Sequence, residues 1–311
     1  MRLLVIGNGS IGRRHAANLE TLGAQVTHLP YRAFHQGAAH DGQFDAVVIA
    51  TATQIRTEPI AFATERGLPF YVEKPLAFRQ EDLARITDLA RPVAERSMTG
   101  YMMRYHPAFR HLAGMDLSDI YRARFEIGHD VRQWRSNWSF AESYAARPEG
   151  GGALLDLCHE IDMAAALFPD LKIGAVTSHG HPAFPGVDFA TEIGFSPTGT
   201  GPAGAVGMDY LSPVSLRRIS LRGTRHTVDF DLAAGSYRIA TGGTWQGIDF
   251  AFDRNEMFLA AMRDFLALVA GKPVSDVEHL PRFDLALPSS ALVVEAYEAR
   301  RFAGMIDGEF A

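Results

Sequence analysis

Apolar and polar residues follow one another in two different rhythms along the chain. In the first third, short apolar runs rich in β-branched residues alternate with stretches that have the periodicity of amphipathic helices. The apolar runs lie at 3–6, 25–29, 45–50, 69–74 and 97–102, and the helical stretches start near Ser10 and cover 56–66 and 80–90. Strand, helix and strand in this order predict a parallel, doubly wound α/β sheet.

The rhythm changes after residue 118. A helix predicted over 151–168 is followed by strand-like runs joined by Gly and Pro turns, and two helices near 254–270 and 284–302 close the chain. The strand-like runs lie at 174–180, 188–195, 205–211, 216–223, 226–232 and 237–241. Strands without intervening helices predict a second, α+β domain with a largely antiparallel sheet. Because 311 residues suit two cores, we expect domains at 1–118 and 119–311.

Composition narrows the class of partner. The formal net charge of -6 lacks the basic excess of a nucleic-acid-binding protein, so a small molecule is the expected partner. The single cysteine, Cys158, excludes an internal disulfide framework and a thiolate metal cluster, and it fits a reducing cytoplasm. No apolar run approaches the roughly 20 residues of a membrane span, and the N-terminal run is shorter than a signal-peptide core. We therefore expect a soluble, cytoplasmic protein without a membrane partner.

Three glycines, Gly7, Gly9 and Gly12, stand directly after the first strand in GNGSIG and open the first helix. In this context the first glycine permits a tight turn, the second lets the backbone approach a pyrophosphate, and the third brings the helix against the strand. A glycine-rich turn without a ligand is the alternative reading. The position between strand and helix favours a dinucleotide site.

The type of dinucleotide depends on the residue that faces the adenosine ribose. NAD-binding proteins carry an acid there, about 20 residues after the glycines, whereas residues 21–40 contain no Asp or Glu. The second strand runs instead into LPYR, which places Arg32 near the ribose, and Arg13 or Arg14 lies beside the loop. A guanidinium can hold a 2′-phosphate, so we expect NADP, with NAD as the alternative.

Lys74, in EKPL, follows the fourth strand and should face the ligand crevice, which lies outside the carboxyl ends of parallel strands. Four motifs follow one another at a characteristic spacing: GNGSIG, YVEKPL, GYMMRYHPAFR and GGGALLDLCHEID. Three more come later in the chain: YLSP, RGTRHTVDFD and NEMFLAAMRDFL. The chain thereby resembles the glucose-fructose oxidoreductase, inositol dehydrogenase and MocA family. Two departures stand out: Asp156 and His159 are three residues apart where many relatives have four, and Arg56 replaces a frequent histidine.

The resemblance implies an N-terminal Rossmann domain, a C-terminal open-faced α/β domain, and homodimers or homotetramers. It also implies transfer of hydride between NAD(P) and a carbinol or carbonyl carbon of a sugar, sugar derivative or cyclitol. The family's lysine falls on Lys74, its helix histidine on His159 and its helix aspartate on Asp156, and these are the expected catalytic residues. The expected cofactor contacts are Gly7, Gly9, Ser10, Ile11, Gly12, Arg13, Arg32, Thr51, Glu73 and Lys74.

The predicted 151–168 helix divides its residues between two faces. At about 100° per residue, Asp156, His159, Glu160 and Met163 fall on one side. The opposite, apolar side carries Leu154, Leu157, Cys158, Ile161, Ala165 and Phe168. A solvated surface face gives the same pattern, but the resemblance favours a substrate cleft. A histidine titrates near neutrality, so His159 and Lys74 are expected to share the substrate's proton while Asp156 orients them. The three glycines before this helix are expected to let it approach the cofactor domain closely.

Further polar candidates lie at the ligand edge and in the second domain. Tyr101, Arg104 and Tyr105 follow the fifth strand, and with Glu160 they are the expected substrate contacts. An interdomain salt bridge is the alternative for Arg104, and Trp134 and Trp138 suit either a core or a sugar-stacking platform. We expect no metal, because no second histidine stands at ligand spacing from His159. The alternative function is that of a sensor or regulatory protein of the same fold, which binds NAD(P) without turnover.

Overall fold

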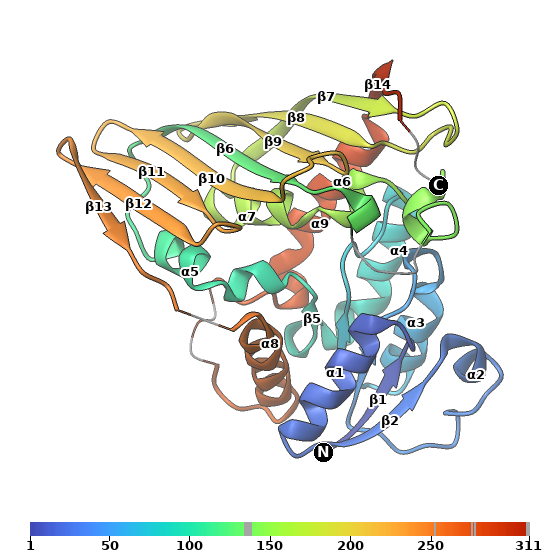
Figure 1. The fold of residues 1–311 in the computed structure, drawn as a ribbon. Coiled ribbons are helices and arrows are strands. Elements are labelled where there is room, and N and C mark those ends of the chain that lie inside the picture. Colours follow the sequence, from blue (N-terminus) through green and yellow to red (C-terminus); the bar gives the residue numbers. More distant parts are fainter. Residues whose placement is uncertain (134–138, 252, 275, 277, 309–311) are drawn as a thin grey trace. The chain divides into compact units, whose positions relative to one another are not determined.

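The computed structural model describes residues 1–133, 139–251, 253–274, 276 and 278–308 (Figure 1). The chain folds into two compact units. The first unit comprises residues 1–106 and 252–290, and the second comprises residues 107–251 and 291–311. This division differs from the single boundary expected after residue 118, because a late segment of the chain returns to the first unit.

The first unit contains a five-stranded parallel sheet in the order β2-β1-β3-β4-β5. Its strands are β1 Arg2–Ile6, β2 Gln25–Leu29, β3 Ala46–Ile49, β4 Phe70–Val72 and β5 Met98–Thr99. Every residue of the central strands β3 and β4 is buried, as the continuous apolar runs predict. The expected parallel, doubly wound sheet is confirmed.

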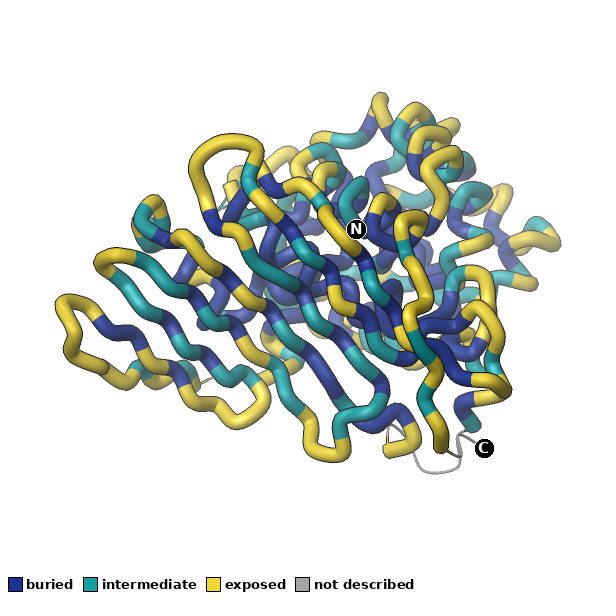
Figure 2. The backbone as a smooth tube through the Cα atoms, turned by 90° about the horizontal axis from the view of Figure 1, so that it is seen from above, coloured by how far each residue is buried: buried dark blue, intermediate teal, exposed yellow. Residues whose placement is uncertain are grey.

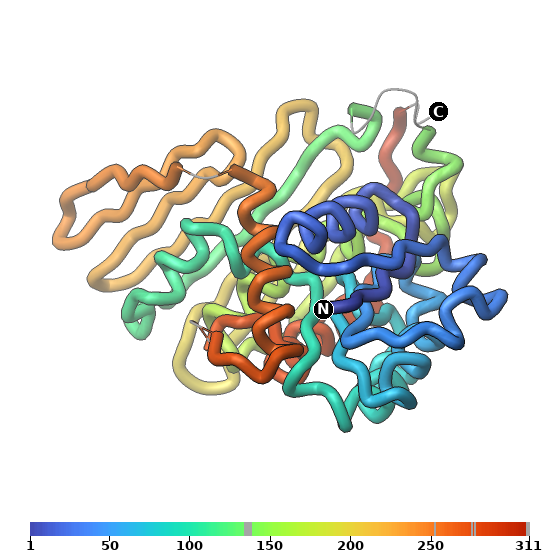
Figure 3. The backbone as a smooth tube through the Cα atoms, turned by 90° about the horizontal axis from the view of Figure 1, so that it is seen from below, coloured from blue at the N-terminus to red at the C-terminus, as the bar shows by residue number. Residues whose placement is uncertain are grey.

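Helices surround this sheet, and one of them comes from the end of the chain. They are α1 Ser10–Thr21, α2 Tyr31–His35, α3 Thr57–Glu65, α4 Gln80–Ala90 and α8 Arg254–Val269, with 3-10 helices at Thr53–Ile55, Arg91–Arg96 and Met102–Tyr105. α8 lies beside α1 (Figure 3), where Asn18 and Asn255 exchange amide hydrogen bonds of 3.3 and 3.0 Å. This contact joins residues 237 positions apart, so no local pattern in the sequence predicts it.

The second unit contains a nine-stranded sheet in the order β13-β12-β11-β10-β6-β9-β8-β7-β14. The strands are β6 Ile120–Gly128, β7 Leu171–Gly180, β8 Ala190–Pro197, β9 Ala203–Asp209, β10 Leu216–Gly223, β11 His226–Asp231, β12 Ser236–Thr241, β13 Thr244–Ile248 and β14 Arg301–Met305. The β6–β9 and β14–β7 pairs are parallel and the other pairs are antiparallel. The expected large, mostly antiparallel sheet is confirmed, although β6, β13 and β14 were not predicted.

One face of this sheet is covered within its own unit and the other is open. The helices α5 Pro107–Ala113, α6 Ala153–Asp156 and α7 His159–Leu167 lie on one side of it, and none of the unit's described helices lies on the opposite side (Figure 1). Burial accordingly alternates along the strands (Figure 2); in β8, Ile193 and Phe195 are buried whereas Glu192 is exposed. The last long helix, α9 Phe283–Glu298, contributes residues to both units.

Among the described residues, no helix combines the length and the apolar character needed to cross a bilayer.

Candidate functional site

The glycine loop after β1 has three glycines with different roles. Gly7 has a positive φ of 120°, and a Cβ built on it would lie 2.2 Å from the Ala50 carbonyl oxygen at the end of β3. A Cβ on Gly12 would lie 1.9 Å from the Gly7 oxygen. Both positions therefore require glycine so that helix, loop and strand can pack together.

Gly9 is different, because a Cβ there would meet nothing within 4 Å. It precedes the first residue of α1, and the exposed residues Asn8, Gly9 and Ser10 leave the backbone open on this side. The first amide groups of a helix have no partner within the helix and favour an anion. The loop therefore fits a pyrophosphate: two glycines close its packing and the third leaves room for close approach.

The strand order reverses between β1 and β3, which is where open α/β sheets bind ligands. Thr51 lies two residues after the end of β3 and is 9% exposed, and its hydroxyl donates to the Ala52 carbonyl at 3.2 Å. Arg13 is exposed, and its Nη1 donates to the Asn8 carbonyl oxygen at 2.5 Å. Arg14 instead lies over the Phe258 ring of α8, 4.6 Å from its centre. Of the two arginines, Arg13 is therefore the one that borders the loop.

The segment after β2 is bonded to an acid from another helix, Glu58 of α3, which the sequence pattern does not show. Arg32 is exposed in the first turn of α2, and its neighbour Tyr31 donates from Oη to Glu58 Oε2 at 2.5 Å. His35 Nδ1 lies 2.9 Å from Glu58 Oε1. Hydrogen bonding to Glu58, with burial, raises the pKa of Tyr31 to about 12. Burial raises the pKa of Glu58, but the bonds from Tyr31 and His35 outweigh it and lower that pKa overall. Glu58 lies in the first turn of α3, so its approach to α2 is a tertiary contact.

Lys74 follows β4, is half-buried, and precedes a cis peptide bond to Pro75. Its backbone is held by Arg56, a residue only 3% exposed, whose Nη2 donates to the carbonyl oxygens of Thr51 and Lys74, each at 3.1 Å. The guanidinium therefore joins the segments that follow β3 and β4. In this chain the residue that replaces the family's frequent histidine fixes the backbone of the candidate lysine.

Glu73 forms a buried pair that sequence reasoning missed. His15 of α1 is fully buried, and its Nε2 lies 2.7 Å from Glu73 Oε1. Burial raises the pKa of Glu73, but the bond from His15 and the charges of His15, Lys74 and Arg56 outweigh it, so the pKa is lowered. A charged carboxylate is thus held beside Lys74. The only signal for this pair in the sequence is a histidine on the apolar side of the first helix.

The expected substrate contacts after β5 are buried and bonded within the first unit. The Tyr101 hydroxyl lies 3.1 Å from Ser290 Oγ, and Arg104 Nη2 donates to Ser289 Oγ at 3.1 Å. Tyr105 is 5% exposed. Both serines belong to α9, so the described contacts of Tyr101 and Arg104 fix the segment after β5 to this helix. A substrate contact for these residues stays a prediction, and Trp134 and Trp138 lie outside the described residues.

The predicted helix over 151–168 is two helices, and the prediction of one continuous helix is wrong. α6 ends at Asp156 and α7 begins at His159, because Leu157 and Cys158 leave helical geometry, with ψ angles of 21° and 0°. The 100° periodicity does not continue across this break. The predicted polar face is therefore not a single exposed face: Glu160 and Met163 are fully buried and His159 is 9% exposed. Cys158 is buried, as expected for a core residue.

Two tyrosines hold Asp156. Tyr144 donates from its hydroxyl to Asp156 Oδ1 at 2.6 Å. The hydroxyl of Tyr210, which follows β9 directly, lies 3.2 Å from Asp156 Oδ2 and 3.0 Å from the Gly152 carbonyl oxygen. Burial, and next the charge of Asp156, raise the pKa of Tyr210 well above its usual value. Tyr210 therefore remains a proton donor to this carboxylate.

Glu160 carries a different contact from the one expected. Its carboxylate accepts from Arg217 Nε at 2.6 Å and from Arg217 Nη2 at 3.2 Å. The Glu160 side chain is fully buried, whereas that of Arg217, on β10, is 21% exposed. This bidentate pair holds α7 against the sheet. A substrate contact for Glu160 stays a prediction.

The start of α6 is fixed by Asp188. The Asp188 carboxylate accepts from the Leu154 amide at 2.8 Å and from Arg300 Nη1 at 2.5 Å, and its carbonyl accepts from the Ala153 amide at 2.9 Å. Gly152 has a φ of 95°, and a Cβ there would lie 2.1 Å from Asp188 Oδ1. This glycine is therefore explained by a contact within the second unit.

The residues with candidate chemistry thus form two sets. In the first unit, the glycine loop, Thr51, Glu73 and Lys74 all follow carboxyl ends of neighbouring strands β1, β3 and β4. In the second unit, Asp156 and His159 stand on either side of the break between α6 and α7. The part of the chain that the structure describes contains no group of three or more His, Cys, Asp or Glu side chains able to hold a metal ion.

Comparison with known proteins finds relatives that match part of the chain. No family model matches the chain. The rhizopine catabolism protein MocA of Rhizobium meliloti is 31% identical over 123 residues, 39% of this chain and 37% of that protein. Inositol 2-dehydrogenase of Paracoccus denitrificans is 26% identical over 197 residues, 56% of each chain. The chain thus spans about half or less of the length of these curated relatives.

Solved structures match over nearly the whole chain, at lower identity. A variant of KijD10, a 3-ketoreductase from Actinomadura kijaniata bound to TDP-benzene and NADP, superposes with a TM-score of 0.79 at 17% identity, covering 98% of this chain and 99% of that one. Levoglucosan dehydrogenase in complex with NADH gives a TM-score of 0.76 at 17% identity, covering 96% and 97%. At this identity the likeness concerns the fold alone. The relatives include MocA and inositol 2-dehydrogenase, in agreement with the resemblance to the glucose-fructose oxidoreductase, inositol dehydrogenase and MocA family.

Proposed function

We propose that the chain is an oxidoreductase that transfers hydride between a nicotinamide dinucleotide and a carbinol or carbonyl carbon of a sugar, sugar derivative or cyclitol. The observation that carries the proposal lies in the first unit. The glycine loop, with Gly9 open to a ligand, and Lys74, fixed through its backbone by Arg56, follow strands of the same parallel sheet at its carboxyl edge. A pure binding protein needs the loop but has no need of the lysine.

Lys74 and His159 are the proposed proton-handling groups. When bound, the nicotinamide supplies the hydride acceptor or donor. Oxidation of a carbinol also needs a base for the hydroxyl proton, and reduction of a carbonyl needs the matching acid. We assign this proton to Lys74 and His159 together, with Asp156 orienting the substrate or these groups. Glu73, the residue before Lys74, supplies a buried carboxylate beside this lysine.

NADP is the proposed cofactor, with NAD as the alternative. Arg32 is exposed just after β2, where the adenosine ribose would lie, and Arg13 borders the glycine loop. The nearby acid, Glu58, is already bonded to Tyr31 and His35. Arg32→Ala is therefore expected to weaken NADP binding and leave NAD binding unchanged. Equal weakening of both would assign Arg32 another role.

A spectrophotometric screen at 340 nm tests the proposal. Sugars and cyclitols, among them myo-inositol and levoglucosan, would be offered with NAD and NADP in parallel. We expect turnover of at least one polyol with one of the two dinucleotides. Tight dinucleotide binding without turnover of any of them would instead identify a sensor or regulatory protein of this fold.

We also propose that the chain forms a homodimer or homotetramer. The subunits would contact one another through the open sheet face or an edge strand of the second unit. Sedimentation of the purified chain would measure this directly. A monomer at all concentrations would contradict it.

A further inference from the structure

Tyr144 is both exposed to solvent and hydrogen-bonded to a candidate catalytic carboxylate. Tyr144 is 49% exposed, yet its hydroxyl donates to the Asp156 carboxylate, at 2.6 Å from Oδ1. An exposed tyrosine on an ordinary surface directs its hydroxyl to water. Here an accessible aromatic ring lies directly beside a candidate catalytic carboxylate.

The backbone fixes this arrangement. Tyr144 opens a 3-10 turn, Tyr144–Ala146, and the Gly152 amide donates to the Ala145 carbonyl oxygen at 2.9 Å. A Cβ on Gly151 would lie 2.7 Å from the Tyr144 carbonyl oxygen and 2.5 Å from that of Arg147. Only glycine lets the turn lie so close to the start of α6. The middle glycine of GGGALLD therefore brings Tyr144 to Asp156.

The intervening segment is also held. The Tyr297 hydroxyl donates to the Pro148 carbonyl oxygen at 3.2 Å and accepts from the Gly150 amide at 3.2 Å. Tyr297 is nearly buried in α9. The segment from Tyr144 to Asp156 is thus anchored at its start, middle and end, and the ring is held in place before any ligand arrives.

The chemistry of the pair limits what Tyr144 can recognise. A tyrosine hydroxyl has one proton, and Tyr144 gives it to Asp156. Towards a ligand, its oxygen can therefore act only as an acceptor, which requires a donor such as a hydroxyl. The exposed ring offers an apolar surface to the C–H groups of a sugar or cyclitol.

We propose that Tyr144 is a specificity-determining residue that accepts a hydrogen bond from a substrate hydroxyl other than the reacting one. This inference rests on the proposed function and adds to it the selection of a polyhydroxylated ring. An ether, keto or deoxy position at that point would lose the bond.

The test compares Tyr144→Phe with Tyr121→Phe, a control tyrosine that is 56% exposed on β6. The probes are the best polyol from the 340 nm screen and its monodeoxy derivatives. For the full polyol we expect Tyr144→Phe to raise KM about fivefold to tenfold with little change in kcat. For one monodeoxy derivative the same substitution should change KM by less than about twofold, because the bond is already missing. Tyr121→Phe should change neither constant.

Two outcomes overturn the inference separately. If the unaltered chain turns over a polyol and Tyr144→Phe leaves its KM unchanged, Tyr144 does not read the substrate although the proposed function stands. An equal effect on the full polyol and on every monodeoxy derivative would also overturn it, because the hydroxyl would then not contact a substrate hydroxyl. If the unaltered chain turns over nothing, the proposed function fails and the inference fails with it. Thermal unfolding of each variant shows whether a loss reflects unfolding.

Discussion

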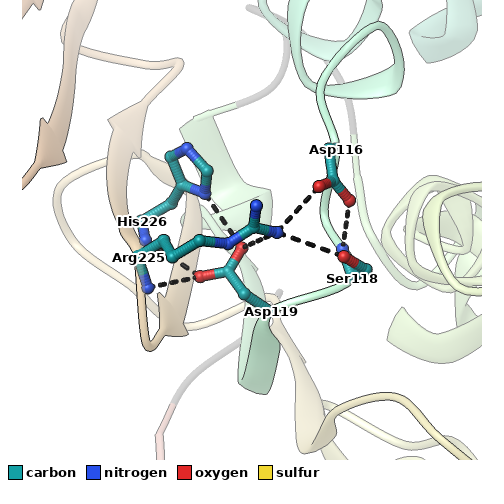
Figure 4. Close-up of polar contacts among 5 residues, drawn as sticks. All are labelled: Asp116, Ser118, Asp119, Arg225 and His226. Carbon is teal, nitrogen blue, oxygen red and sulfur yellow. Dashed lines mark hydrogen bonds and ion pairs between the residues drawn. The ribbon is translucent and has the colours of Figure 1, made fainter.

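Asp119 pins the turn between β10 and β11 to the segment before β6 (Figure 4). Its Oδ2 accepts from the backbone amides of Arg225 and His226, at 2.7 and 2.9 Å, and its Oδ1 lies 2.9 Å from His226 Nδ1. The Asp119 side chain is 4% exposed. Asp116 also bonds Arg225, at 2.7 Å, but its side chain is 60% exposed. The two aspartates are a matched pair that differs in burial.

The substitution Asp119→Asn removes the charge and keeps the shape. Burial raises the pKa of Asp119, but the bonds from His226 and from the two backbone amides outweigh it and lower the pKa from 3.8 to about 2. At about 1.4 kcal/mol for each pKa unit, the ionised carboxylate contributes about 2 kcal/mol to the free energy of unfolding at pH 7. A depressed pKa stabilises the fold above the unfolded value, near pH 4, and this contribution disappears as the pH falls towards 2.

Urea unfolding of the unaltered chain, Asp119→Asn and Asp116→Asn at several pH values measures this contribution. We expect Asp119→Asn to lower the free energy of unfolding by about 2 kcal/mol at pH 7 and by about half as much at pH 3. Asp116→Asn should have a clearly smaller effect, because its charge is solvated. Equal effects of the two substitutions, or a loss that does not change with pH, would refute the reasoning.

Two further predictions concern glycine spacing and a buried charge. Gly12→Ala places a Cβ 1.9 Å from the carbonyl oxygen of Gly7, so it should lower the thermal unfolding midpoint. In Gly9→Ala the new Cβ meets no atom within 4 Å, so this change should weaken only dinucleotide binding, measured by calorimetry. The opposite pattern of effects would contradict the assigned roles. Arg217→Met leaves the buried Glu160 carboxylate without its bidentate partner and should cost about 3–5 kcal/mol in urea unfolding. The same change at the neighbouring Arg218, whose side chain is 54% exposed, should cost less than about 1 kcal/mol, and similar losses would disprove the burial argument.

The sequence pattern predicts elements well where burial and periodicity coincide. β3 and β4 are buried along their whole length and therefore appear as continuous apolar runs. β10, over Leu216–Gly223, alternates buried and accessible positions and was predicted with these bounds. β13, over Thr244–Ile248, was missed because its first four residues are exposed, so it has no alternation. The predicted last helix ran over the first two residues of β14, Arg301–Met305, and the parallel pairing of this segment with β7 makes it a strand.

The glycine loop could be predicted from sequence, but the contacts that fix the candidate side chains could not. Gly7, Gly9 and Gly12 act within six residues of one another, so their spacing carries the signal. His15 and Glu73 are 58 positions apart, and Tyr210 and Asp156 are 54 apart. The local periodicity of apolar and polar residues does not predict contacts between residues so far apart in the sequence.

The break between α6 and α7 shows a further limit of the sequence pattern. Two non-helical residues interrupt the helical period, while the composition of the segment stays that of a single amphipathic helix.

Lys74→Ala tests the central claim most directly. The assay follows absorbance at 340 nm with the best polyol and its dinucleotide, while calorimetry measures dinucleotide binding. Lys272→Ala, an exposed lysine of the first unit, is the control. We predict that Lys74→Ala abolishes turnover, keeps dinucleotide binding and keeps the fold, and that Lys272→Ala changes none of these. Turnover by Lys74→Ala equal to that of the unaltered chain would contradict the account.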